Sequence, residues 1–180
     1  LFGSTGEIVT EKSGNLNLGI PGVMYVGAIC GVIGSFFYEH SVPDASAMNG
    51  TLAILIPMAC CMLGSLLMGI LYCFLTVTLR ANQNVTGLAM TTFGVGFGNF
   101  FGGSLSTLAG GVGQISVAVT GDAYRAKLPF LSKIPVIGEI FFNYGFLTYF
   151  AIIITLLMAF FLKRTRWGLN LNAVGESPAT

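Results

Sequence analysis

The sequence predicts an all-α fold, a polytopic membrane helix bundle of about four spans with broken or re-entrant segments. Charged residues make up only 8% of the 180 residues, whereas 54% are hydrophobic. So few charges cannot cover a water-soluble surface. The charges are also separated by neutral stretches of 26, 35, 41 and 23 residues, at 13–38, 45–79, 81–121 and 140–162. A membrane-spanning helix needs about 20 apolar residues, so each stretch has room for one span.

The first span is predicted over residues 18–37, after a short helical tail at 1–11. The segment that leads into it, residues 13–22, contains two Asn, three Gly and one Pro, a composition that disfavours a regular helix. Beyond it, Gly27, Gly31 and Ser35 recur every four residues. Such a stripe of small residues lets a second helix approach closely.

The second span is predicted over residues 51–79, which carry no charge, with a kink near Pro57. Arg80 ends it, and a polar run leads to a second interrupted segment at 85–101, where Gly94, Gly98 and Gly102 form another stripe. A Gly/Ser-rich stretch and an amphiphilic loop are expected over 102–143. The last span is expected over 144–162.

The basic residues set the predicted orientation, because cytoplasmic loops carry an excess of Lys and Arg. With four alternating spans, one group of basic residues falls in the cytoplasm, including the cluster directly after the last span: Lys12, Arg80, Lys163, Arg164 and Arg166. The second group falls outside: Arg125, Lys127 and Lys133. Asp44 is likewise expected outside, and both ends of the chain inside.

Several classes of function are excluded or disfavoured by the residues present. The formal net charge of +1 leaves no basic patch for a nucleic acid. The single histidine, His40, lies at the end of a span beside Glu39, no carboxylate lies inside a predicted span, and no serine is placed beside a base. The four cysteines lie in apolar segments without metal-ligand spacing and are interpreted as packing residues. No catalytic residue, metal or cofactor is therefore expected.

The paired broken segments point to a path for a solute. Non-helical backbone at membrane depth persists only where protein or a water-filled cavity satisfies its polar groups. Two interrupted hydrophobic segments are the best sequence pointer to a transporter's substrate path. The amides at these breaks are the predicted path residues: Asn15, Asn17, Asn82, Gln83 and Asn84. An alternative stays open, in which these amides only cap helices at the cytoplasmic interface.

No ionisable side chain lies within a predicted span, although ion-coupled transporters usually need one. The energy for transport is therefore expected to come from another chain. Uncharged hydrogen-bonding groups beside aromatic stripes favour a neutral solute over an ion.

Two long motifs resemble one family. Residues 10–22, TEKSGNLNLGIPG, resemble the E-[KR]-S-G-x-x-N-[LI]-G-x-E-G segment of membrane permease subunits of ATP-binding-cassette (ABC) importers. Residues 164–179, RTRWGLNLNAVGESPA, resemble the R-T-x-W-G-L-x-L-R-A-V-G-E-N-P-x-A cytoplasmic loop of the same family. Residues 75–83 and 131–138 also fit. The branch is that of ribose, branched-chain amino acid and nucleoside uptake, and the similarity is greatest to nucleoside permeases that work with a basic-membrane lipoprotein.

The resemblance implies one transmembrane permease domain over 1–180, present in part, because family members are nearly twice this length. It implies four partners: an ABC ATPase subunit that hydrolyses ATP, a second permease subunit, an extracellular or periplasmic solute-binding lipoprotein, and the lipid bilayer of the cell membrane. Residues 163–180 would begin the loop that couples the permease to the ATPase. The residues expected to act in this coupling are Arg166, Trp167, Gly168, Gly175, Glu176 and Pro178.

Within that loop, Gly168 to Gly175 are expected to form a flexible lead. A new helix is expected at Ser177 and Pro178, which suit an N-cap and a first helical position. Two positions depart from the family pattern. Pro21 stands where the family has Glu, so no role of that carboxylate carries over. Asn172 replaces a basic residue, which is expected to weaken one contact with the ATPase.

The sequence thus favours a permease subunit of an ATP-driven importer, with a nucleoside as the solute. A sugar or a branched-chain amino acid is the alternative substrate. A passive channel for a small neutral solute and a non-transporting membrane anchor are the alternatives from other classes. The channel would not need a docking loop after the last span, and the anchor would not need paired broken helices.

Overall fold

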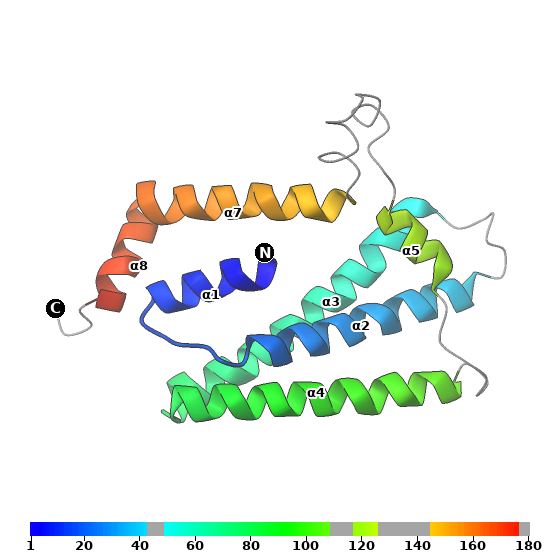
Figure 1. Ribbon diagram of the computed structural model, residues 1–180, viewed down its shortest axis with the longest axis horizontal. Helices are drawn as coiled ribbons and strands as arrows, with labels where there is room; N and C mark the ends of the chain where they lie inside the picture. Colours follow the sequence, from blue (N-terminus) through cyan, green and yellow to red (C-terminus); the bar gives the residue numbers. More distant parts are fainter. Residues whose placement is uncertain (43–48, 109–116, 126–144, 177–180) are drawn as a thin grey trace, which may run out of the picture. The chain divides into compact units, whose positions relative to one another are not determined.

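The computed structural model describes residues 1–42, 49–108, 117–125 and 145–176, and the elements within these ranges are helical (Figure 1). The chain divides into two compact units, residues 17–120 and residues 1–16 with 121–180. The first contains α2 (Ile20–Ser41), α3 (Gly50–Cys73), a π-helical turn (Phe74–Thr78) and α4 (Gln83–Leu108). The second contains α1 (Phe2–Lys12), α7 (Phe146–Arg164) and α8 (Arg166–Glu176), and α5 (Ala118–Arg125) crosses the boundary.

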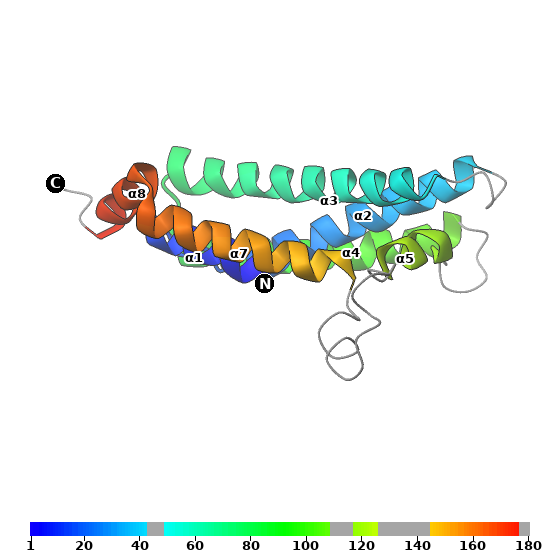
Figure 2. The ribbon, with the colours of Figure 1, turned by 90° about the horizontal axis from the view of Figure 1, so that it is seen from above.

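In the unit of residues 17–120, α2 packs against both α3 and α4 (Figures 1 and 2). Its antiparallel contact with α3 pairs glycines with cysteines: Cys60 lies against Gly34, and Cys30 lies against Gly64. On its other side, the backbone of Gly22 lies directly against Gly94 of α4. The predicted small-residue stripes also serve helix packing, because Gly27 and Gly31 lie against Cys61 of α3, and Gly98 lies against Tyr25 of α2.

A small apolar core joins the three long helices of this unit. It consists of Val26, Met68, Tyr72 and Met90, with Phe97 packed against it. Most other large apolar side chains of α3 point outward. An outward apolar surface is stable in a bilayer, where lipid tails replace water as the solvent.

At the far end of α2, the Glu39 side chain holds the start of α5. Its Oε1 accepts a hydrogen bond from the Thr120 backbone N–H at 2.8 Å. A carboxylate is favourable at a helix N-terminus because the first amides have no partner within the helix.

In the other unit, α1 lies along α7 in the same chain direction. The hydroxyls of Thr5 and Thr155 are 3.0 Å apart, and the rings of Phe2 and Phe150 are 6.1 Å apart. The α1 helix confirms the helical tail expected over residues 1–11, and it continues as far as Lys12.

Three of the four predicted spans are confirmed as helices long and apolar enough to cross a membrane: Ile20–Ser41, Gly50–Thr78 and Phe146–Arg164. Pro57 lies inside α3, as expected. The fourth, α4, is 26 residues long but is not among these apolar helices. Its sequence includes six glycines together with Asn, Gln, Thr and Ser.

Two expectations for the unit of residues 17–120 are corrected. The segment 85–101 is not interrupted, because α4 runs continuously to Leu108 and the chain breaks before it instead. Residues 102–143 are not one loop, since they contain the end of α4 and all of α5. The rest of that region, with Lys127, Lys133 and the 131–138 motif, lies outside the described residues, as does Asp44.

Candidate functional site

The break before α2 is built by Asn17. Its Oδ1 accepts a hydrogen bond from the Gly19 backbone N–H at 2.9 Å, which fixes a tight turn where the helix begins. Pro21 follows in the first turn of α2. Proline is well tolerated there, because the amide it lacks would have no partner in the helix.

The break before α4 follows the π-helical turn that extends α3. Arg80 has a positive φ of 52°, a left-handed conformation that reverses the chain at a cost of roughly 1–2 kcal/mol for a residue with a side chain. Asn82 then caps α4: its Oδ1 accepts from the backbone N–H groups of Asn84, at 3.1 Å, and Val85, at 3.3 Å. Asn82 thus acts as an N-cap residue.

The two breaks lie side by side in the structure. Gly87 of α4 is packed against the backbone of Leu18 and Gly19, and the Thr91 hydroxyl donates to the Leu18 carbonyl at 2.9 Å. The contact joins the residues just before α2 to the first three turns of α4. The structure therefore brings Asn17 to the same end of this unit as Asn82, Gln83 and Asn84.

The remaining predicted path residues differ in their surroundings. Gln83 is half-buried at the start of α4, and Asn84 is exposed. Asn15 belongs to the other unit, where its backbone N–H donates to the Thr10 carbonyl at 3.2 Å. Asn82 caps α4 and Asn17 forms the turn before α2, and contact of these five residues with a solute remains a prediction.

The second candidate site is the surface that follows α7. Thr165 makes the bend between α7 and α8: its hydroxyl donates to the Phe161 carbonyl at 2.6 Å and accepts from the Gly168 backbone N–H at 3.1 Å. One side chain thus ends α7 and caps α8. The flexible lead expected from Gly168 to Gly175 is wrong, because these residues form most of α8.

The glycines of α8 allow close contacts rather than flexibility. A side chain at Gly168 would collide with the Phe161 carbonyl, and one at Gly175 would collide with the Lys12 carbonyl and lie 2.9 Å from the Gly14 nitrogen. Gly14 itself has a φ of +85°, which glycine adopts without strain. The two long sequence motifs therefore meet, backbone against backbone, at Gly14 and Gly175.

Asn172 lies between Gly168 and Gly175 on α8 and also contacts its own chain, because its side-chain amide nitrogen donates to the Leu162 carbonyl at 3.2 Å. The opposite side of α8 is open. Trp167 is 80% exposed, Val174 is 61% exposed, and Arg166 and Glu176 are also exposed. Pro178, and with it the helix expected from Ser177, lies outside the described residues.

Thr165 and Gly14 are functional candidates that the sequence reasoning did not single out. Thr165 carries a usable signal, since a threonine directly before a segment with apolar residues is a common helix start. The contact of Gly14 with Gly175 has no local signal, because about 160 residues separate the two positions.

The fold and these two surfaces define a polytopic membrane protein with adjoining helix breaks and a short helix that leaves the last span at its basic end. The whole chain, residues 1–180, matches the family model described as the permease component of the branched-chain amino acid transport system. The chain belongs to this family of ABC importer permeases and is a multi-pass membrane protein.

Three curated relatives support the assignment. A putative glucose ABC transporter permease, TsgC13 of Haloferax volcanii, is 31% identical over 99% of this chain and 48% of its own length. The guanosine permease NupQ of Bacillus subtilis is 29% identical over 96% and 51%. The nucleoside permease NupC of Lactococcus lactis is 33% identical over 99% and 52%. The chain thus spans about half the length of these relatives. No solved structure matches it.

Proposed function

We propose that this chain forms part of the membrane path of an ABC importer for a small neutral solute, with nucleosides as the favoured class. Membership in the permease family over the whole chain carries the proposal. Two of the three relatives named above are nucleoside or guanosine permeases. The adjoining breaks before α2 and α4 place amide side chains and non-helical backbone at one end of a helix bundle, where a path can open.

The chain is a transporter component, and we propose that a separate ATPase subunit supplies the energy. The support is α8, which packs its glycine side on its own chain and leaves Trp167 and Val174 exposed. An exposed aromatic beside apolar and charged residues is typical of a protein–protein contact. A second permease subunit and a solute-binding lipoprotein would complete the complex in the cell membrane.

The test is solute-stimulated ATP hydrolysis by the intact permease, reconstituted with its partner chains in lipid vesicles. Guanosine and uridine should stimulate hydrolysis and be taken up only when ATP is present. Stimulation by glucose instead would assign the chain to sugar uptake, as the name of the archaeal relative suggests, and stimulation by leucine alone to amino acid uptake. Solute flux that is equal with and without ATP would contradict the importer and favour a passive channel.

A further inference from the structure

Basic side chains gather where α7 ends and α8 begins. Lys163 and Arg164 are the last two residues of α7, and Arg166 is the first residue of α8. We call these three residues the α7–α8 junction. All three side chains are exposed, and none forms an ion pair with a residue that the structure describes. Such a cluster of cations attracts an anion from outside the chain.

Two carboxylates at this end of the unit lie beside Lys12, the last residue of α1. Glu11 precedes Lys12 in the sequence, and Glu176 follows Gly175, whose backbone packs on that of Lys12. Along α8, Glu176 is ten residues, or about 15 Å, from Arg166. Lys12 and the α7–α8 junction together have more cations than these two carboxylates can balance. The junction therefore keeps a net positive charge.

The length of α7 places these cations at the boundary of the bilayer. The helix has 19 residues, about 28 Å at 1.5 Å per residue, which matches a hydrocarbon core about 30 Å thick. Its last residues, Lys163 and Arg164, therefore reach the level of the lipid headgroups. The bend at Thr165 is fixed by hydrogen bonds of its hydroxyl to both helices, and it keeps Arg166 next to that boundary.

The face of α7 that leads to the cations is apolar and exposed. Leu156 is 66% exposed and Phe160 is 62% exposed. Their spacing of four residues continues to Arg164, and Lys163 is three residues beyond Phe160, so these residues share one side of the helix. An apolar stripe that ends in cations complements a phospholipid, which has acyl chains below an anionic phosphate. An acidic protein surface in water would complement only the cations.

We propose that the α7–α8 junction binds the headgroup of an anionic phospholipid, whose acyl chains lie along Leu156 and Phe160. Lys163, Arg164 and Arg166 donate charge-assisted hydrogen bonds to the phosphate oxygens. A zwitterionic headgroup carries its own ammonium group, so the unbalanced cations favour a lipid with net negative charge. The inference does not depend on the proposed transport function. A bound lipid would hold the start of α8 at the membrane.

The test uses the full-length permease, purified in detergent without its partner chains and mixed with phosphatidylglycerol or phosphatidylcholine of the same acyl chains. Native mass spectrometry counts the bound lipids. We expect phosphatidylglycerol to bind at a concentration at least about tenfold lower than phosphatidylcholine. Lys163→Gln combined with Arg164→Gln should bring the two concentrations to within about twofold, since each basic residue near the headgroups contributes about a fivefold preference.

Two control variants separate binding at the junction from net charge and from folding. Lys127→Gln with Lys133→Gln removes the same charge from the predicted external loop and should leave the lipid preference unchanged. Lys163→Arg with Arg164→Lys keeps both cations and should bind phosphatidylglycerol as the unmodified permease does. All variants should elute from a size-exclusion column at the volume of the unmodified permease.

Three results would overturn the lipid site. Unchanged phosphatidylglycerol binding by the double glutamine variant at positions 163 and 164 would show that the junction does not hold the lipid. An equal loss in the variant at positions 127 and 133 would show that net charge decides the preference. If the variant at 163 and 164 keeps its lipid but no longer binds the ATPase subunit, the junction is a protein contact. ATP-dependent uptake by the unmodified importer is measured separately, so either proposal can fail alone.

Discussion

At the scale of single residues, the close contact between Gly14 and Gly175 joins the two ends of one unit. Neither position tolerates a side chain: Gly14 has a left-handed backbone, and a Cβ on Gly175 would collide with the Lys12 carbonyl. Packing without side chains transmits displacement directly, since closely packed backbones cannot move independently. Movement of α8 would therefore reach α1 through these two glycines.

We predict that Gly175→Leu separates α8 from α1 and lowers both uptake and solute-stimulated ATP hydrolysis in the intact importer. Overpacking of this kind costs typically 1–3 kcal/mol, enough to shift α8 without loss of the membrane helices. Uptake and ATP hydrolysis are measured in vesicles that contain equal amounts of permease. Gly6→Leu on α1 is the control, because no atom of the described residues lies within 4 Å of a Cβ built at that position. Normal coupling in Gly175→Leu would show that this contact is not needed.

At the scale of helices, the seam between α2 and α3 depends on an alternation of cysteine and glycine. Cys30 fills the space over Gly64, and Cys60 fills the space over Gly34. Helices in a bilayer gain stability from such close packing, because lipid supplies no hydrophobic driving force between them. Cys30 and Cys60 therefore have the packing role expected from the sequence, whereas Cys73 is exposed.

We predict that Gly64→Leu destabilises the bundle by about 1–3 kcal/mol, because the new side chain meets the Cys30 sulfur and Cβ. Unfolding in a series of detergent and denaturant mixtures measures the change. Gly69→Leu on the same helix, where no part of the chain that the structure describes lies within 4 Å of a new Cβ, should have little effect. Adding Cys30→Gly to Gly64→Leu should restore part of the stability. Equal stability of the Gly64 and Gly69 variants would contradict the packing arrangement.

The sequence predicts the long helices well and their ends less well. Apolar stretches between charges identify α2, α3 and α7, since length and composition decide whether a helix can cross a membrane. The glycines of α8 are wrongly interpreted as a flexible lead, because a local pattern cannot show that Gly168 and Gly175 face other backbone segments. The same limit applies to Asn17 and Asn82: the sequence leaves capping and solute contact open, and in the structure Asn82 caps α4 whereas Asn17 forms the turn before α2.

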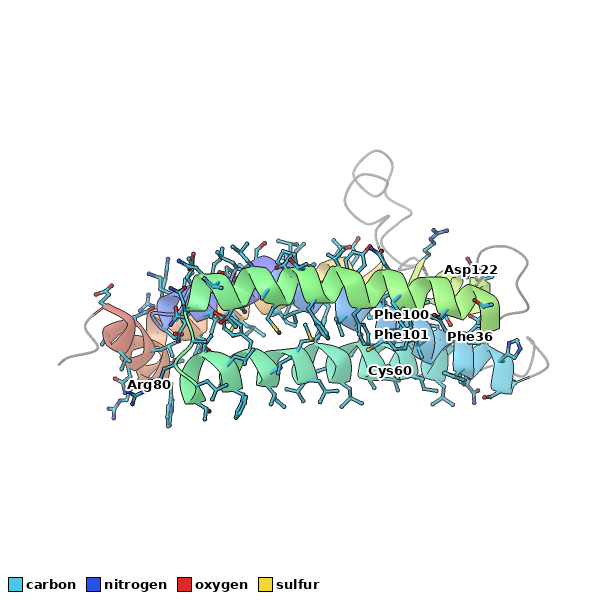
Figure 3. All side chains as sticks on the ribbon, turned by 90° about the horizontal axis from the view of Figure 1, so that it is seen from below. Phe36, Cys60, Arg80, Phe100, Phe101 and Asp122 are labelled. Atoms are coloured by element: carbon cyan, nitrogen blue, oxygen red, sulfur yellow. The ribbon has the colours of Figure 1, made fainter. Side chains whose placement is uncertain are left out.

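At the scale of the whole molecule, the basic residues agree with the helix directions within each unit. In one unit, α1 and α7 run in the same direction, so Lys12 and the Lys163–Arg164 pair lie at corresponding ends. In the other, α3 runs antiparallel to α2 and α4, and Arg80 follows its end (Figure 3). An orientation with these ends in the cytoplasm obeys the positive-inside rule.

We therefore predict that positions 12, 80 and 166 are cytoplasmic and that position 125 is external. Single cysteines at these positions, in a background without the four native cysteines, are treated in intact cells with a thiol reagent that does not cross the membrane. Position 125 should be labelled, and positions 12, 80 and 166 should react only after the membrane is opened with detergent. Arg125 is the last residue of α5, and its predicted external side follows from the number of predicted spans that precede it. Labelling of position 166 but not of position 125 in intact cells would reverse the orientation, and α8 would then face away from any cytoplasmic ATPase.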